Sequence, residues 1–311
     1  QPDFVWNKPR DTTGWHRVFD SVRGVLNVVY PNDTYVSEVM PSPGGLNAFD
    51  SDGFTMGTNT GSNENTKLFV TWNWKGGTTS GLSGGTITPT AYSFDTTSCS
   101  SIIKYTGNGS AGATIPHGLG KKPDLIIVKC LSNTEGWMVY HTSLGATKFL
   151  KLDADGGPVT ATSRWNDTEP TSTVFSVGTS SDVNTNTQTY IAYVFASVKG
   201  FSKISTYVGN GNADGPFIYT GFKPGFVLIK YNGTNQWQLR DNKRGFNGAI
   251  KTLYPDSYEV ETSGDTFDIL SNGFKPRNTG TPQNQAGVGY YYAAFAASPI
   301  VSSNSKAGTA R

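Results

Sequence analysis

Three consecutive residues, Trp165, Asn166 and Asp167, combine the side chains that sugars are bound by. A sugar has an apolar face that packs on an aromatic ring and a rim of hydroxyl groups that bond to amides and carboxylates. Because the three lie in a polar loop, we expect carbohydrate binding there, with Tyr254 and Tyr258 as further candidates. The alternative for Trp165 is burial under its loop or in a subunit contact.

Catalytic chemistry has weaker support. The three histidines, His16, His117 and His141, follow no common pattern in the sequence. The sequence leaves a Ser-His-Asp triad open, because its members need only be close together in the folded chain. Glu259 and Glu261 would point to one face of a strand, and glycosidases use paired carboxylates. The simpler interpretation of Glu259 and Glu261 is that they lie on an exposed, solvated face of the strand. No Cys, His or carboxylate side chains recur at the spacing of a zinc site. Taken with the weak catalytic signals, this leads us to predict no enzyme activity, no metal and no cofactor.

The composition favours a β-rich chain with a neutral polar surface. Among 311 residues only 15% are charged, against about 25% in typical soluble proteins, while 37 are glycine. The net charge of +2 is nearly balanced and without basic runs, so we predict no nucleic-acid binding. Apolar runs do not reach the ~18 residues of a membrane span, so we predict no membrane insertion. Cys99 and Cys130 are expected to be unpaired thiols.

The chain repeats itself at an interval of about one hundred residues, the scale of one domain. Four blocks of the middle of the chain return in the same order near its end. Residues 104–109 (KYTGNG) return within 205–211 (STYVGNG), 123–129 (PDLIIVK) as 224–230 (PGFVLIK), 137–141 (WMVYH) as 237–241 (WQLRD), and 189–196 (TYIAYVFA) as 289–296 (GYYYAAFA).

A third, incomplete copy lies at the amino end, where residues 2–8, 15–20 and 69–74 repeat the last three blocks. The hairpin block that should precede it is missing. We therefore expect an upstream segment or a neighbouring chain to complete this first unit, because an unpaired sheet edge invites other strands. The predicted domains are a partial unit at 1–78, a second at 79–198 with a leading linker, and a third at 199–311 that ends in a polar tail.

Each unit is expected to be an antiparallel β-sandwich. Runs of β-branched and aromatic residues alternate with Gly, Asn, Asp, Pro and Ser, which indicates strands joined by turns. Seven or eight such strands in roughly 100 residues are typical of a sandwich or jelly roll. The predicted fold class is thus all-β, with tandem repeats and a first unit that is incomplete at its N-terminus.

An Asp-x-x-Arg element follows the Trp-containing block in two units, as Asp20 with Arg23 and Asp241 with Arg244. The second unit departs from it with His141 at the position of the aspartate. We expect each pair to stabilise a turn, and an exposed pair contributes only about 0–1 kcal/mol.

With these blocks, the chain resembles a family of bacteriophage tail-fibre and tail structural proteins, whose repeats carry the same motifs in the same order. The resemblance implies concanavalin A-like or SPRY-like lectin units on the virion surface, which is an extracellular location. It implies other virion proteins as partners, a homo-oligomer that by analogy is a trimer, and host-surface carbohydrate as a ligand. A capsid or tail decoration or spacer protein without a ligand is the alternative, and a polysaccharide-degrading glycosidase is a weaker one.

Overall fold

The computed structural model describes residues 1–264, 267–298, 300–301 and 307–308. Regular structure in this part of the chain is nearly all β-strand in several antiparallel sheets, which confirms the predicted all-β class. Most of the polar tail predicted from Ser298 lies outside the described residues. Within the described residues, no helix is long and apolar enough to cross a membrane. The helices are single turns, α1 (Thr60–Asn63), α2 (Thr162–Trp165) and α3 (Ser181–Asn184).

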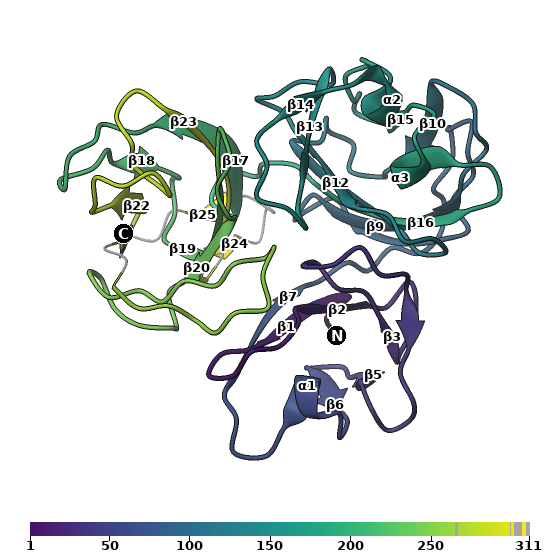
Figure 1. Ribbon diagram of the computed structural model, residues 1–311. Coiled ribbons are helices and arrows are strands. Elements are labelled where there is room, and N and C mark those ends of the chain that lie inside the picture. The colour runs from purple at the N-terminus through teal and green to yellow at the C-terminus, as the bar shows by residue number, and fades with distance from the viewer. Residues whose placement is uncertain (265–266, 299, 302–306, 309–311) are drawn as a thin grey trace.

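The strands form three lobes around a common centre (Figure 1). We define lobe 1 as residues 4–74, lobe 2 as residues 91–195 and lobe 3 as residues 202–296. Each lobe places one central sheet against the other two lobes. In sheet order these are β2 (Arg17–Asp20), β1 (Phe4–Pro9) and β7 (Phe69–Trp74) in lobe 1; β14 (Val159–Thr160), β13 (Lys148–Lys151), β12 (Trp137–His141), β11 (Leu125–Cys130), β16 (Thr189–Phe195), β9 (Ser100–Thr106) and β8 (Ala91–Asp95) in lobe 2; and β20 (Gln238–Asp241), β19 (Pro224–Tyr231), β23 (Gly289–Ala296) and β17 (Ser202–Val208) in lobe 3.

The same antiparallel register relates the middle strands of all three sheets. Phe4 in β1 pairs with Asp20 and Trp74, as Leu125 in β11 pairs with His141 and Phe195. In lobe 3, Phe226 takes the equivalent place between Asp241 and Phe295. Residues of different lobes can therefore be compared position by position.

Smaller sheets and loops cover the outer face of each central sheet, so that every lobe has a core of its own. All residues of β1 and β11 are consequently buried, because both faces of these strands are covered. The smaller sheets pair β3 (Asn27–Val28) with β4 (Glu38–Val39), β5 (Leu46–Phe49) with β6 (Phe54–Met56), β10 (Ala113–Pro116) with β15 (Val174–Val177), β22 (Gly273–Pro276) with both β18 (Ile218–Tyr219) and β21 (Phe267–Leu270), and β24 (Ile300–Val301) with β25 (Ala307–Gly308).

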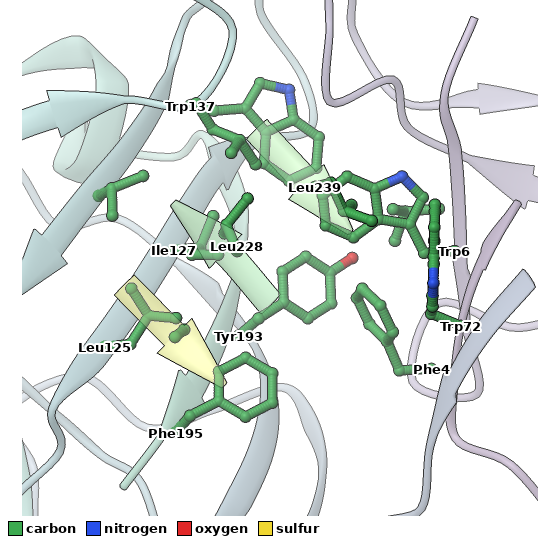
Figure 2. Close-up of a cluster of buried hydrophobic side chains, with 14 of the residues drawn as sticks. Phe4, Trp6, Trp72, Leu125, Ile127, Trp137, Tyr193, Phe195, Leu228 and Leu239 are labelled. Atoms are coloured by element: carbon green, nitrogen blue, oxygen red, sulfur yellow. The ribbon is translucent and has the colours of Figure 1, made fainter. Parts of the chain in front are cut away.

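A fourth core joins the lobes where their central sheets meet, and we call it the common core. It is rich in aromatic rings. The single indole of Trp74, for example, packs against the rings of Phe4, Phe195, Phe226 and Phe295. The apolar cavity within it measures only about 30 Å³, so the three sheets are closely packed. Figure 2 shows side chains from all three lobes converging there: Phe4, Trp6 and Trp72 from lobe 1, Leu125, Ile127, Trp137, Tyr193 and Phe195 from lobe 2, and Leu228 and Leu239 from lobe 3.

Candidate functional site

The main carbohydrate candidate of the sequence, Trp165, lies in the core of lobe 2. Its side chain is 2% exposed and meets the ring of Tyr140 edge to face, at 6.0 Å between centroids. Of the two interpretations that the sequence left open for Trp165, burial under its loop is the one observed, and the ring is not an accessible platform for a sugar in this structure. The physical reason is that the short helix α2 turns the indole inward, where burying its large apolar surface stabilises the lobe.

The other candidates keep polar or exposed positions but lie in two different lobes. Asn166 is partly buried and Asp167 exposed, and both have left-handed backbone angles (φ 54° and 49°) beyond the end of α2. Tyr254, in lobe 3, is partly buried, and its hydroxyl lies 2.8 Å from Thr262 Oγ1. Tyr258 is 59% exposed. Among the predicted aromatic candidates, only Tyr258 presents a largely open ring.

The residues predicted as possible catalytic groups do not converge on a shared cleft. His16, His117 and His141 are all buried, and each has a hydrogen-bond partner. Glu261 is held by Arg10 at 2.9 Å and by Arg244 at 3.3 Å. Burial acts to raise the pKa of Glu261, but the hydrogen bonds and charges of these arginines outweigh it and lower the pKa below its ordinary value. A glycosidase acid needs the opposite shift.

Three equivalent lysines reach across the junctions between lobes. Lys8 of lobe 1 donates to the carbonyl of Glu259 in lobe 3 (2.8 Å), and Lys129 of lobe 2 donates to that of Thr34 in lobe 1 (3.1 Å). Lys230 of lobe 3 donates to the carbonyl of residue 155 in lobe 2 (2.9 Å). Burial lowers the pKa of each of these lysines to about 8. The contacts run in one rotational sense and close a ring.

A second set of contacts runs beside the lysines. The indole of Trp137 donates to the carbonyl of Tyr30 (2.9 Å), and that of Trp237 donates to the carbonyl of Lys151 (2.7 Å). The block alignment places Trp15 at this position in lobe 1, but the register shows that His16 occupies it. Since His16 Nδ1 accepts from Trp6 Nε1 (2.9 Å), its Nε2 carries the proton and faces Tyr254 O at 3.0 Å.

With imidazole in place of indole, lobe 1 keeps its contact with lobe 3 through His16 and Tyr254. The imidazole of His16 is neutral. Burial and the nearby charge of Lys8 hold the pKa of His16 well below its ordinary value. Trp15 lies instead on the outer side of lobe 1, partly buried, with its ring stacked on that of Tyr35.

A third set of contacts lies at the opposite end of the same strands. The carboxylate of Asp20 accepts from the hydroxyl of Tyr193 in lobe 2 (2.8 Å), and Asp241 accepts from the indole of Trp72 in lobe 1 (3.1 Å). His141, their equivalent in lobe 2, points Nε2 at the carbonyl of Tyr292 in lobe 3 (3.4 Å). Each lobe thus bonds to the next one around the centre.

The two arginines of the Asp-x-x-Arg elements are buried beside these aspartates. Arg23 binds Asp20 and Arg244 binds Asp241, each at 2.6 Å and with side chains no more than 3% exposed. The turn role that the sequence predicts is observed, since each aspartate also accepts from the backbone amide of its arginine. The expectation of a weak, exposed pair is wrong, because the neighbouring lobe covers both groups and a buried pair is costly to break.

A pocket of about 460 Å³ opens at the end of the common core that carries Trp74. Aromatic rings form much of its wall, and polar side chains of β7 and of two neighbouring loops surround them. Its volume falls within the usual range of ligand pockets, roughly 300–1,000 Å³. Sequence reasoning missed this pocket because all three lobes contribute to it. The residues that line it include Thr71, Trp72, Asn73, Trp74, Phe201, Phe226, Asn242 and Phe295.

Comparison with known proteins places the chain in one family. No curated protein and no solved structure matches it. One family model, described as a domain of unknown function (DUF7483), matches residues 1–299 and so spans all three lobes and the ring of contacts between them. On this match, the chain belongs to the DUF7483 family.

Proposed function

We propose that this protein is a structural component of the outside of a bacteriophage particle, a tail fibre or a fibre-like appendage. In this proposal the lobes are tandem β-sandwich units of the concanavalin A-like or jelly-roll type, the first of them incomplete. The protein acts without catalysis, assembles with other virion proteins, and contributes to binding of glycans on the host surface.

The observation that carries the proposal is the closed ring of contacts between the lobes. Three buried lysines and three buried residues at the Asp20 position each join one lobe to the next, and a common aromatic core fills the centre. Such packing opposes movement of one lobe against another, which suits a load-bearing or spacing element better than an enzyme that must open and close. The low share of charged residues, 15%, and the nearly balanced net charge of +2 fit a protein that works outside the cell.

This location can be tested directly. Antibodies raised against the purified chain are expected to label the surface of intact particles of the virus that encodes it, at a fixed position, in immunogold electron microscopy. Labelling only after particles are broken open, or no labelling of particles at all, would refute the proposal.

The burial of Trp165 favours a second candidate, a decoration or spacer protein without a ligand. With that ring in the core of lobe 2, the exposed aromatic candidate for a sugar is Tyr258. The two functions therefore differ in what this one side chain does.

A glycan array separates these two functions. If the protein is an adhesin that uses Tyr258, the Tyr258→Ala variant is expected to lose most of its binding, because stacking on the sugar face is removed. Phe246→Ala is the matched control, since Phe246 is 75% exposed in the same lobe. Equal binding by both variants would remove Tyr258 from the site, and no binding by the native chain would favour the spacer.

A further inference from the structure

Lobe 1 lacks a strand that lobes 2 and 3 both have. In lobe 2, β9 pairs with β16 over seven residues, and in lobe 3, β17 pairs with β23 over seven residues. The equivalent of β16 and β23 in lobe 1 is β7, which pairs with β1 on one side. On the other side of β7, no strand of the described part of the chain is paired with it.

The register shows which backbone groups of β7 face this open edge. Ala196 N donates to Cys99 O, and counting back by twos along β16 places Ala192 and Val194 among the residues that bond to β9. Their equivalents in β7 are Thr71 and Asn73, since Trp72 occupies the position of Tyr193. The amide and carbonyl groups of Thr71 and Asn73 therefore point away from β1, toward the open edge.

The pocket of about 460 Å³ at the Trp74 end of the common core, which we call the junction pocket, lies along the same edge. Thr71, Trp72 and Asn73 all line it. In lobe 2 the cross-strand neighbour of Tyr193 is Ile102, and in lobe 3 the equivalent neighbour is Ile204. Both isoleucines belong to the common core. Beside Trp72 the matching third side chain is missing among the described residues, and the pocket of about 460 Å³ opens there.

We propose that the open edge of β7 receives an antiparallel β-strand from a partner protein. The incoming strand resembles β9 and β17: about seven residues, with a β-branched apolar side chain opposite Trp72 that fills the junction pocket. Backbone hydrogen bonds to Thr71 and Asn73 hold it, in the manner of strand addition to a sheet edge. Both strands of this type in the described residues are already paired in their own sheets, so neither is available to close this edge.

The probe is a synthetic peptide with the sequence of residues 202–211 (SKISTYVGNG), in which the isoleucine of β17 is retained. We expect this peptide to bind the full chain at a 1:1 ratio in fluorescence polarisation. In amide hydrogen exchange, the peptide is expected to slow exchange of Thr71 and Asn73, because their amides become donors to the new strand.

Two matched proline variants locate the binding edge. Thr71→Pro removes an outward-facing amide from β7, and proline is tolerated at such an edge, so the variant is expected to fold. Its peptide affinity is expected to fall at least about tenfold, through the lost bond and the obstructed edge. Thr206→Pro makes the same change on the outer edge of β17, where Thr206 is exposed, and is expected to bind the peptide as the native chain does.

Three results would overturn the proposal. One is unchanged peptide binding by Thr71→Pro when circular dichroism shows that the variant is folded. Another is slow exchange of Thr71 and Asn73 in the free monomer, which would mean that the chain closes its own edge. The third is a dimer of the native chain in light scattering that Thr71→Pro abolishes, which would assign the edge to a second copy.

Discussion

Replacing Asp241 by alanine is expected to lower the free energy of unfolding by about 3–5 kcal/mol, the usual cost of removing one member of a buried ion pair. The carboxylate serves two lobes at once. It binds Arg244 at 2.6 Å within lobe 3 and the indole of Trp72 at 3.1 Å across the junction with lobe 1. Its loss leaves a buried guanidinium short of charge compensation and a buried indole without its acceptor.

Denaturant unfolding followed by tryptophan fluorescence measures this loss. The control is Asp214→Ala, in which an exposed aspartate loses its ion pairs with Lys275 and Arg277. Solvent screens both of these ion pairs, so the unfolding midpoint of Asp214→Ala is expected to stay nearly equal to that of the native chain. Equal midpoints for the two variants would show that the contact between lobes 1 and 3 at Asp241 contributes little to stability.

The second large effect concerns pH. Burial, more than any other factor, lowers the pKa of His141 to about 4. The unfolded chain takes up a proton near the ordinary histidine pKa of about 6.5, so between pH 6.5 and 4 the unfolded state binds more protons at this site. The stability associated with neutral His141 is therefore complete above pH 6.5 and is lost as the pH falls toward 4. The loss amounts to about 3 kcal/mol.

The variant His141→Gln isolates this contribution because an amide does not titrate. The difference in unfolding free energy between the native chain and this variant is expected to shift by about 3 kcal/mol in favour of the variant between pH 7 and 4. Asp256→Asn is the control of opposite sign, since burial raises the pKa of Asp256 to about 7. A pH-independent difference for His141→Gln would mean that the folded and unfolded states bind this proton equally, so that burial does not lower the pKa of His141.

Local structure was largely readable from the sequence. Alternating β-branched and aromatic residues predicted the closing strands, which are observed as β7, β16 and β23. Cys99 and Cys130 are free thiols, as their small number suggested. These features depend on neighbours within a few residues, where propensity and hydrophobic period act directly.

The candidate sites were harder, because exposure depends on contacts between distant segments. A tryptophan in a polar loop indicates a binding platform, but one turn of helix buries Trp165 against Tyr140. An aspartate three residues from an arginine indicates an ion pair on the surface, but the neighbouring lobe covers Asp20 and Asp241. Neither outcome leaves a signal in the local sequence.

By itself, then, the sequence determined that the chain is β-rich, that its blocks recur, and that one block lacks a counterpart before the first strand. Only the tertiary structure decided that the central sheets meet in a common core and that lysines and aspartates join one lobe to the next. The physical reason is that strand periodicity reports which face of a strand is apolar but carries no information about what covers it. In this protein the inner face of each central sheet is covered by the other lobes, about one hundred residues away in the chain.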